Sequence, residues 1–274
     1  MMEKNETRYD FGRNWSEFSQ QLSGDSISLA DKGLKKLVSE LAGERFMDIG
    51  SGSGLHSLSA LRLGAQSAYC IDYDVDSVAT TKSVLSTHAS DQSWQARRGD
   101  ILKENITNVD VAPFDTVYSW GVLHHTGDMW LAIDNASSFV KDGGRFVIAL
   151  YMKTYFCGFW KFEKWLYSRY RWLRPFLKYP YAFLALLAHA LRKGISPSRF
   201  MREYKQVRGM NFMHDVDDWL GGYPYQSVTH EEIVKHMKKK GFSLENSFNT
   251  KRPIGVFGSG CGEWVFRKDG VSAK

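Results

Sequence analysis

A short apolar run followed at once by three closely spaced glycines constrains this chain more than any other feature. Arg45–Ile49 has the length and apolar content of a buried strand, and Gly50, Gly52 and Gly54 allow the backbone to turn sharply beside a ligand. The residues from Leu55 onward continue at helical spacing. A strand, a glycine turn and a helix N-terminus form the nucleotide cradle of a doubly wound α/β fold.

The glycine spacing favours one class of nucleotide over another. A dinucleotide fingerprint counted from Gly50 and Gly52 requires its third glycine at position 55, where this chain has Leu55. Asp48 also places a carboxylate beside the turn, where it would repel a pyrophosphate and attract a cationic sulfonium. The residues therefore favour S-adenosylmethionine over a dinucleotide.

Five segments in register resemble the motifs of class I S-adenosylmethionine-dependent methyltransferases. The first is FMDIGSGSGLHSLSALRLGA at 46–65. The others follow in order, as AYCID at 68–72, RGDI at 98–101, FDTVYSWGVLHH at 114–125 and KDGGRFVI at 141–148. The tail from Thr229 resembles the closing helix and antiparallel strand pair of the same fold. Five segments in register are a stronger signal than a lone glycine turn, which is common in α/β proteins.

The resemblance and the hydrophobic periodicity imply a doubly wound, mostly parallel seven-stranded sheet, a Rossmann-like methyltransferase fold with a helical cap insertion. Strands are expected near 45–49, 68–72, 93–98, 114–119, 144–150, 242–249 and 262–268, and helices near 27–42, 54–63, 75–87 and 128–140. We divide the chain into an N-terminal helical lid segment (1–43), a cofactor-binding core (44–151), a cap (152–228) and a completing segment (229–274). Aromatic residues at 9–15 either fold over the cofactor or plug the edge of the core.

The resemblance also implies which residues hold the cofactor. The acid that ends the second strand, Asp72, takes the ribose hydroxyls, and Asp100 accepts a hydrogen bond from the adenine amino group. The full expected cofactor-binding set is Asp48, Gly50, Ser51, Gly52, Gly54, Asp72, Tyr73, Asp100, Ile101, Ser119 and Trp120. No resident metal is expected.

Two adjacent histidines occupy the position that faces the donor methyl in the family. His124 and His125 are suited to removing a proton near neutral pH, and we favour His125 as the base. The alternative is that one packs inside the loop while the other shapes the pocket. The expected acceptor-binding residues are His214, Tyr223 and Tyr225. The run 214–218 also resembles a metal cluster, but it fits an N-cap and first helical turn better.

Positive charge and aromatic residues gather in one segment. Residues 151–208 hold thirteen Lys and Arg against two Glu, a local balance of +11 in a chain of net charge +6. On a helix, one stripe comprises Phe159, Phe162, Leu166, Tyr170 and Leu173, and a second comprises Lys161, Lys164, Ser168 and Arg171. The pattern predicts an amphipathic cap helix, and Pro175 and Pro180 break that pattern. Residues 182–191 are apolar but too few to span a bilayer.

Four interpretations of that segment compete: a lid over a small substrate, a monotopic membrane contact, a nucleic-acid surface, and a cap whose aromatic stripe is simply buried. Nucleic acid is disfavoured, because Ser119-Trp120-Gly121-Val122 replaces the tetrapeptide of many base-directed N-methyltransferases. The resemblance is to the small-molecule branch, including ubiquinone- and menaquinone-type and bacterial natural-product or glycan enzymes.

We therefore expect methyl transfer to an oxygen, nitrogen or carbon atom of a small molecule. The alternatives are a lipid- or glycan-linked acceptor at a membrane surface, or a non-catalytic scaffold that keeps the cofactor fold. Three widely spaced cysteines and a polar N-terminus without a secretory signal favour the cytoplasm, with peripheral membrane contact through the basic segment left open.

Overall fold

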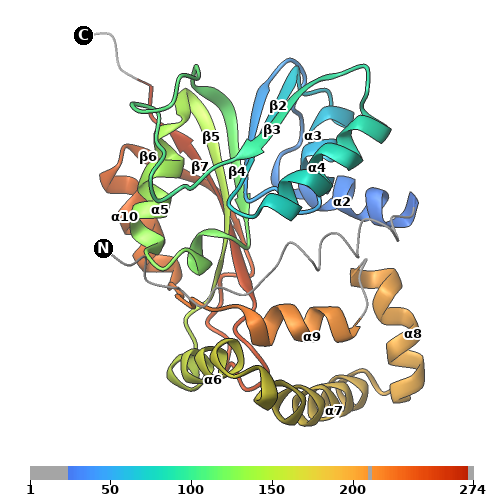
Figure 1. Ribbon diagram of the computed structural model, residues 1–274. Coiled ribbons are helices and arrows are strands. Elements are labelled where there is room, and N and C mark those ends of the chain that lie inside the picture. The colour runs from blue at the N-terminus through green and yellow to red at the C-terminus, as the bar shows by residue number, and fades with distance from the viewer. Residues whose placement is uncertain (1–23, 209–211, 271–274) are drawn as a thin grey trace.

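The centre of the computed structural model, which describes residues 24–208 and 212–270, is one seven-stranded sheet (Figure 1). Its strands lie in the order β3-β2-β1-β4-β5-β7-β6. They are β1 (Arg45–Ile49), β2 (Ser67–Asp72), β3 (Ser93–Arg98), β4 (Phe114–Trp120), β5 (Val140–Tyr151), β6 (Phe242–Phe248) and β7 (Cys261–Lys268). β7 runs antiparallel to both of its neighbours, β5 and β6, and all other neighbouring strands pair in parallel. The predicted doubly wound, mostly parallel sheet is confirmed, although β5 begins earlier than expected.

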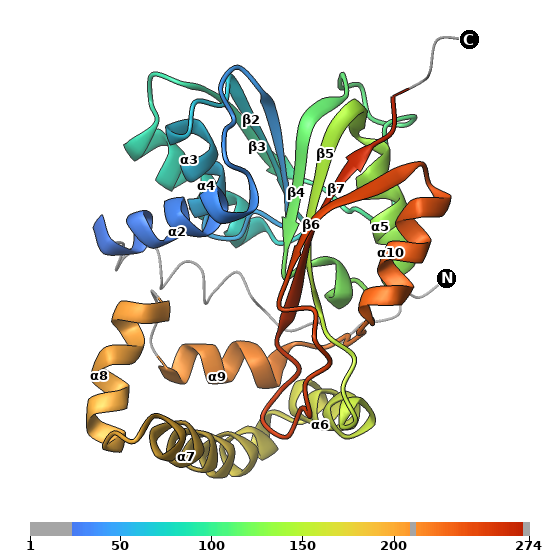
Figure 2. The ribbon, with the colours of Figure 1, turned by 180° about the vertical axis from the view of Figure 1, so that it is seen from behind.

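Helices cover both faces of the sheet (Figures 1 and 2). On one face lie α2 (Gly24–Leu37), α3 (Leu55–Arg62) and α4 (Val75–His88), and on the other lie α5 (Met129–Ser138) and α10 (His230–Lys239). Successive strand residues point to opposite faces, so neighbouring residues of β1 belong to different cores. Phe46 packs in the same buried cluster as Leu34 of α2, whereas Met47 packs with Ile133 of α5.

Side-chain caps fix where the helices beside the carboxyl edge begin. Asp74 Oδ1 accepts a hydrogen bond of 2.8 Å from the Ser77 backbone N–H at the start of α4. Asp128 does the same for Leu131 at the start of α5. These caps satisfy N–H groups that have no partner within the helix, so the two loops end at defined positions.

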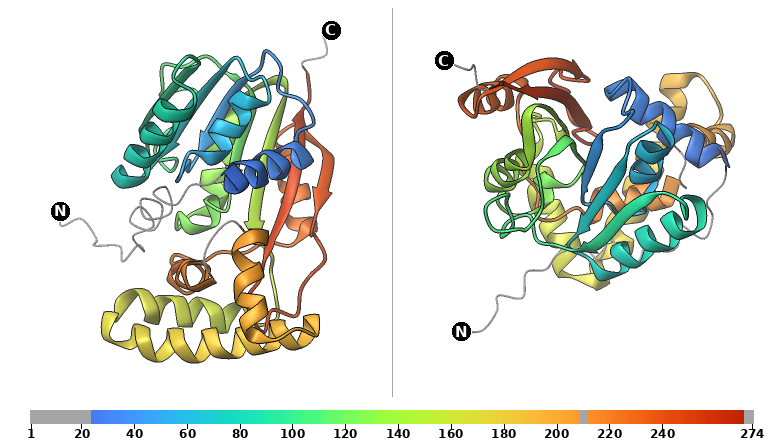
Figure 3. Two further views of the ribbon diagram at one scale, coloured as in Figure 1. Left: turned by 90° about the vertical axis from the view of Figure 1, so that its right-hand side faces the viewer. Right: turned by 90° about the horizontal axis from the view of Figure 1, so that it is seen from above.

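Four helices between β5 and α10 form a separate layer. They are α6 (Cys157–Arg169), α7 (Arg174–Lys193), α8 (Pro197–Arg208) and α9 (Phe212–Gly221), with a short 3₁₀ turn η2 (Arg171–Leu173) between the first two. The layer lies beyond the carboxyl ends of the strands (Figure 3). It has its own apolar cluster, in which Trp160, Tyr167 and Phe200 are buried. The aromatic residues at 9–15, which were expected either to fold over the cofactor or to plug the edge of the core, lie outside the described residues.

The structure contradicts the interpretation in which the aromatic stripe of α6 is buried. Phe159 and Phe162 of that stripe are exposed, whereas Trp160 and Tyr167 are buried. Trp160 and Tyr167 occupy the interior because the interior also offers hydrogen-bond partners for the indole N–H and the phenol hydroxyl. Trp160 Nε1 donates to the Gly255 carbonyl at 2.6 Å, and the Tyr167 hydroxyl donates to Asp217 Oδ1 at 2.8 Å.

The predicted break occurs before Pro175, because α6 ends at Arg169, but it does not occur at Pro180. Pro175 occupies the first turn of α7, where a missing N–H costs little, and Pro180 lies inside the helix, which continues to Lys193. The apolar residues 182–191 therefore belong to one 20-residue helix. Among the residues the structure describes, no helix is both long enough and apolar enough to cross a bilayer.

Two consecutive ionisable residues of α6, Glu163 and Lys164, are both buried. Lys164 Nζ lies 3.7 Å from the centroid of the Trp219 indole ring and, within the described residues, has no hydrogen-bond partner. Burial lowers the pKa of Lys164 to about 7, although the neighbouring carboxylate of Glu163 opposes the shift. Burial likewise raises the pKa of Glu163 to about 7.

Because Lys164 is buried without a hydrogen-bond partner among the described residues, we expect its replacement by an apolar side chain to stabilise the protein. Native Lys164 holds fewer protons than the unfolded chain between pH 7 and about 10.4, so its cost is full below pH 7 and fades above it. At pH 6, where Glu163 is largely protonated, Lys164→Met should raise the free energy of unfolding by about 1–4 kcal/mol. The gain should shrink as pH rises toward 10. Urea denaturation measures both, and the exposed Lys161→Met on the same helix is the control. A Lys164→Met protein less stable than the wild type at pH 6 would contradict this account.

Candidate functional site

The glycine turn after β1 needs glycine for two separate reasons. Gly50, Gly52 and Gly54 all have positive φ, at 79°, 53° and 75°, a region that L side chains rarely adopt. In addition, a Cβ on Gly50 would overlap the side chain of Val122, which comes from the loop after β4. The turn therefore presents bare backbone to the space at the carboxyl end of the sheet.

Asp72 at the end of β2 is anchored to this turn. One carboxylate oxygen accepts a hydrogen bond from the Gly52 N–H at 2.9 Å, and the other accepts from the Asp74 N–H at 2.9 Å. Burial raises the pKa of Asp72 to about 6 against the opposing effect of these bonds. The carboxylate is thus held in one orientation at the rim of the turn.

Asp48 lies beneath the turn and does not line the cavity. It is buried, and one oxygen accepts a 2.6 Å hydrogen bond from the Ser57 hydroxyl of α3. Burial, assisted by the charge of Asp72, raises the pKa of Asp48 to about 7. Its position ties β1 to the helix that follows the turn.

Asp100 and Ile101 follow β3 at the same edge of the sheet. Asp100 Oδ1 accepts a hydrogen bond from the Leu102 N–H at 3.1 Å, which tightens the loop. A bidentate pair between Arg97 and Glu104 lies next to this loop, and Glu104 also accepts from the Asp100 N–H. Hydrogen bonds within the protein therefore hold this loop in one conformation.

One cavity of about 1700 Å³ joins these elements to the helical layer. Its sheet end is lined by most of the expected cofactor-binding residues, and its far end by residues of the loop after β4, the end of β5, and α9. Expected residues that line it are Gly50, Ser51, Gly52, Asp72, Tyr73, Asp100, Ile101, Trp120, His125 and Tyr223. Expected residues absent from the lining are Asp48, Gly54, Ser119, His124, His214 and Tyr225. Ser119 instead donates from its hydroxyl to the Ile49 carbonyl at 2.9 Å, which links the ends of β4 and β1.

The two histidines occupy different environments. His124 is fully buried, its ring lies 4.0 Å from the Tyr151 ring, and burial lowers its pKa well below the usual value. His125 lines the cavity, and its Nδ1 lies 2.8 Å from the Pro224 carbonyl oxygen. Because a carbonyl can only accept, the neutral His125 ring carries its hydrogen on Nδ1 and keeps its basic lone pair on Nε2.

Of the three expected acceptor-binding residues, one lines the cavity and two do not. Tyr223 lines the cavity, whereas Tyr225 is buried behind it and donates from its hydroxyl to Ser259 at 3.3 Å. The segment around His214 forms part of α9. Within it, Asp217 accepts from Tyr167 and from Lys178, and the described residues contain no cluster of three groups able to hold a metal ion.

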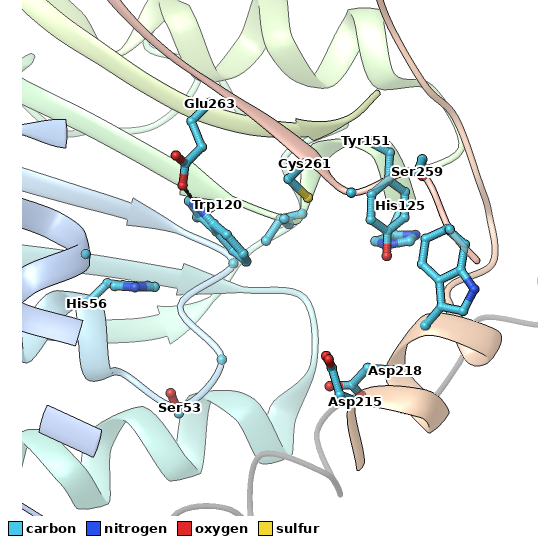
Figure 4. A pocket seen from close by; sticks show the side chains of 18 of the residues that line it. Ser53, His56, Trp120, His125, Tyr151, Asp215, Asp218, Ser259, Cys261 and Glu263 are labelled. Carbon is cyan, nitrogen blue, oxygen red and sulfur yellow. Dashed lines mark hydrogen bonds between the residues drawn. The ribbon is translucent and has the colours of Figure 1, made fainter. Parts of the chain in front are cut away.

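Sequence reasoning missed several residues that line the far end of the cavity (Figure 4). Tyr151 ends β5, so the rule that ligands lie at carboxyl strand ends was a usable signal. Asp215 and Asp218 face the same space from α9, opposite His125 and Tyr151, and their three-residue spacing on one helix face was also readable.

Glu263 carried no sequence signal. It comes from β7, where it accepts a hydrogen bond from Trp120 Nε1 at 3.0 Å and pairs with Lys36 at 2.6 Å. These bonds fix the Trp120 indole at the wall of the cavity. The contact joins residues 143 positions apart in the chain, so no local pattern predicts it.

Comparison with known proteins agrees with this geometry. A family model described as "Methyltransferase domain" matches residues 25–203. The chain is 30% identical over 112 residues to the ubiquinone biosynthesis O-methyltransferase of Maricaulis maris, which covers 41% of this chain and 42% of the relative. It is 28% identical over 112 residues to the tRNA U34 carboxymethyltransferase of Idiomarina loihiensis, which covers 40% of this chain and 34% of the relative. The matches thus span less than half of either relative.

The fold is also that of a solved enzyme. The magnesium protoporphyrin IX methyltransferase of Synechocystis PCC 6803, with bound SAH, superposes with a TM-score of 0.53 at 15% identity, over 89% of this chain and 84% of that one. The family model spans more than half of the chain and contains the glycine turn and the acidic strand ends. The chain belongs to the methyltransferase domain family, as a class I S-adenosylmethionine-dependent member.

Proposed function

We propose that this protein transfers a methyl group from S-adenosylmethionine to an oxygen, nitrogen or carbon atom of a small molecule. One observation carries the proposal. One cavity runs from the glycine turn and Asp72 to a far end lined by His125, Tyr151 and Tyr223. We call this far end the second chamber, or acceptor chamber. A cofactor at the first end and an acceptor at the second would share one continuous space, as direct transfer requires.

The residues present fit the cofactor. Bound S-adenosylmethionine supplies an electrophilic methyl group on a sulfonium. Asp72 would accept from the ribose hydroxyls and Asp100 from the adenine amino group, with Tyr73 and Ile101 beside the base. The rest of the cofactor would contact the cavity wall formed by Gly50, Ser51, Gly52 and Trp120. The turn and the strand ends that hold this wall in place are shaped by Asp48, Gly54 and Ser119.

His125 is our proposed base. Its Nδ1–H donates to the Pro224 carbonyl, which fixes the ring, and its Nε2 would take a proton from the acceptor. The burial and the lowered pKa of His124 favour a packing role for that ring against Tyr151. His214, Tyr223 and Tyr225 remain our proposed acceptor-side residues, with Tyr223 directly at the cavity.

A small acceptor is favoured over nucleic acid by two carboxylates that face His125 and Tyr151. Asp215 and Asp218 would repel a phosphate backbone at that point, whereas Lys193 and Lys251 line other parts of the same cavity. The relatives by themselves include both a ubiquinone-pathway and a tRNA enzyme. We place the reaction in a reducing compartment such as the cytoplasm, because Cys70, Cys157 and Cys261 form no disulfide.

A second candidate, a lipid- or glycan-linked acceptor at a membrane surface, is favoured by the exposed aromatic residues of α7. Methyl-labelled S-adenosylmethionine incubated with the protein and separated cell fractions tests both candidates. Label in the small-molecule fraction supports the first, and label in the lipid fraction supports the second. Label in RNA alone would overturn both. Cofactor binding without any transfer would identify a non-catalytic scaffold.

A further inference from the structure

The outer side of α7 carries large apolar side chains along its whole length. We define this outer stripe as six exposed residues at helical spacing, Trp172 in η2 and then Phe176, Tyr179, Phe183, Leu187 and Leu191 in α7. Their exposures run from 39% for Leu187 to 72% for Leu191. At 1.5 Å per residue the part of the stripe that lies in α7, from Phe176 to Leu191, is about 22 Å long. A monomeric soluble protein rarely exposes a continuous apolar surface of this extent.

The inner side of α7 shows that this orientation is built into the fold. Ala182, Ala185 and Ala190 face inward and are buried, so the small residues pack and the large ones project. Two bonds hold the helix in this orientation: Lys178 pairs with Asp217 of α9 at 2.6 Å, and the Tyr181 hydroxyl donates to the Phe257 carbonyl at 2.9 Å. Rotating the stripe inward would break both bonds.

The exposed charges of α6, η2 and α7 have one sign. The α6–α7 segment, residues 157–193, contains a single acidic residue, Glu163, and it is buried. The exposed charges there, including Lys161, Arg169 and Arg171, are all basic. Aromatic and leucine side chains bordered by lysine and arginine are the composition of helices that lie in the headgroup region of anionic bilayers. An acidic protein partner would match the charge but not the long, convex aromatic row.

We propose that the outer stripe of α7 docks the protein on an anionic membrane surface, with the helix lying parallel to the bilayer. The opposite side of the same helix contributes Tyr181, Ala185 and His189 to the cavity. Docking would therefore place the acceptor chamber next to the lipid headgroups, within reach of an amphipathic acceptor. The docking itself does not depend on methyl transfer.

Flotation of the full chain with vesicles tests the docking. The protein should float with phosphatidylcholine vesicles that contain phosphatidylglycerol, and much less with phosphatidylcholine alone or at high salt. Phe176→Ser/Phe183→Ser should lower the bound fraction at least about tenfold. The matched control Leu131→Ser/Leu244→Ser removes two exposed leucines from α5 and β6 and should float like the wild type.

A charge variant and a measurement of cofactor binding complete the experiment. Lys161→Gln/Arg171→Gln should weaken binding to the anionic vesicles by roughly tenfold while retaining the apolar stripe. Binding of S-adenosylmethionine, measured by calorimetry, should be unchanged in all variants, which separates loss of docking from loss of the fold or of the proposed function. Failure of the wild type to float at low salt would overturn the proposal. So would equal flotation of the stripe variant, or a concentration-dependent dimer that the stripe substitutions abolish.

Discussion

Replacement of His125 by asparagine should lower kcat by about 10²–10⁴ while leaving the affinity for S-adenosylmethionine unchanged. Asparagine retains an N–H that can donate to the Pro224 carbonyl, so the loop should keep its shape. What the variant loses is the basic Nε2 at the acceptor end of the cavity. The measurement is the rate of methyl transfer to the acceptor found with labelled cofactor, together with calorimetry of cofactor binding.

The control for this substitution is His88→Asn, which changes an exposed histidine of α4 and should leave both quantities unaltered. A His125→Asn enzyme within about threefold of the wild-type kcat would exclude His125 as the base. In that case catalysis would rest on alignment of acceptor and methyl alone, which is sufficient for acceptors that are already deprotonated.

Replacement of Asp72 should produce the largest effect on cofactor affinity. Its carboxylate is fixed by the Gly52 and Asp74 N–H groups, so it is already oriented before a ligand binds. Asp72→Ala should weaken S-adenosylmethionine binding by about 1.5–3 kcal/mol, or roughly 10- to 150-fold. Asp72→Asn should lie between, because an amide oxygen can still accept from Gly52 but carries no charge.

The pH dependence of binding provides a second test of the same residue. Burial raises the pKa of Asp72 to about 6, so lowering the pH through 6 neutralises it in the free protein. Cofactor affinity should therefore fall below pH 6 in the wild type and change less in Asp72→Asn. The exposed Asp76→Ala in the first turn of α4 is the control. An Asp72→Ala protein with wild-type affinity would remove this carboxylate from the site.

The sheet and its cradle could be predicted because their signals are local. Gly50, Gly52 and Gly54 follow an apolar run directly, and Asp72 closes the next one, so strand ends and turn chemistry can be identified within short windows. Parallel order then brings those ends to one edge of the sheet. The cavity lining at Asp72 and Asp100 follows from that rule alone.

The helical layer could not be predicted as well because its faces are set by distant partners. Trp160 is buried because the Gly255 carbonyl accepts from its indole, and Tyr167 because Asp217 does the same for its hydroxyl. Neither contact is visible in the spacing of α6, where Phe159 and Phe162 were the obvious core candidates. Glu263 reaches Trp120 by the same kind of long-range bond.

A crystal structure of the protein with S-adenosylhomocysteine would test the central claim most directly. The account predicts the ribose hydroxyls on the Asp72 carboxylate, the adenine beside Asp100 and Ile101, and the sulfur directed toward the chamber of His125 and Tyr151. A ligand bound away from the glycine turn, or a sulfur directed away from that chamber, would contradict it.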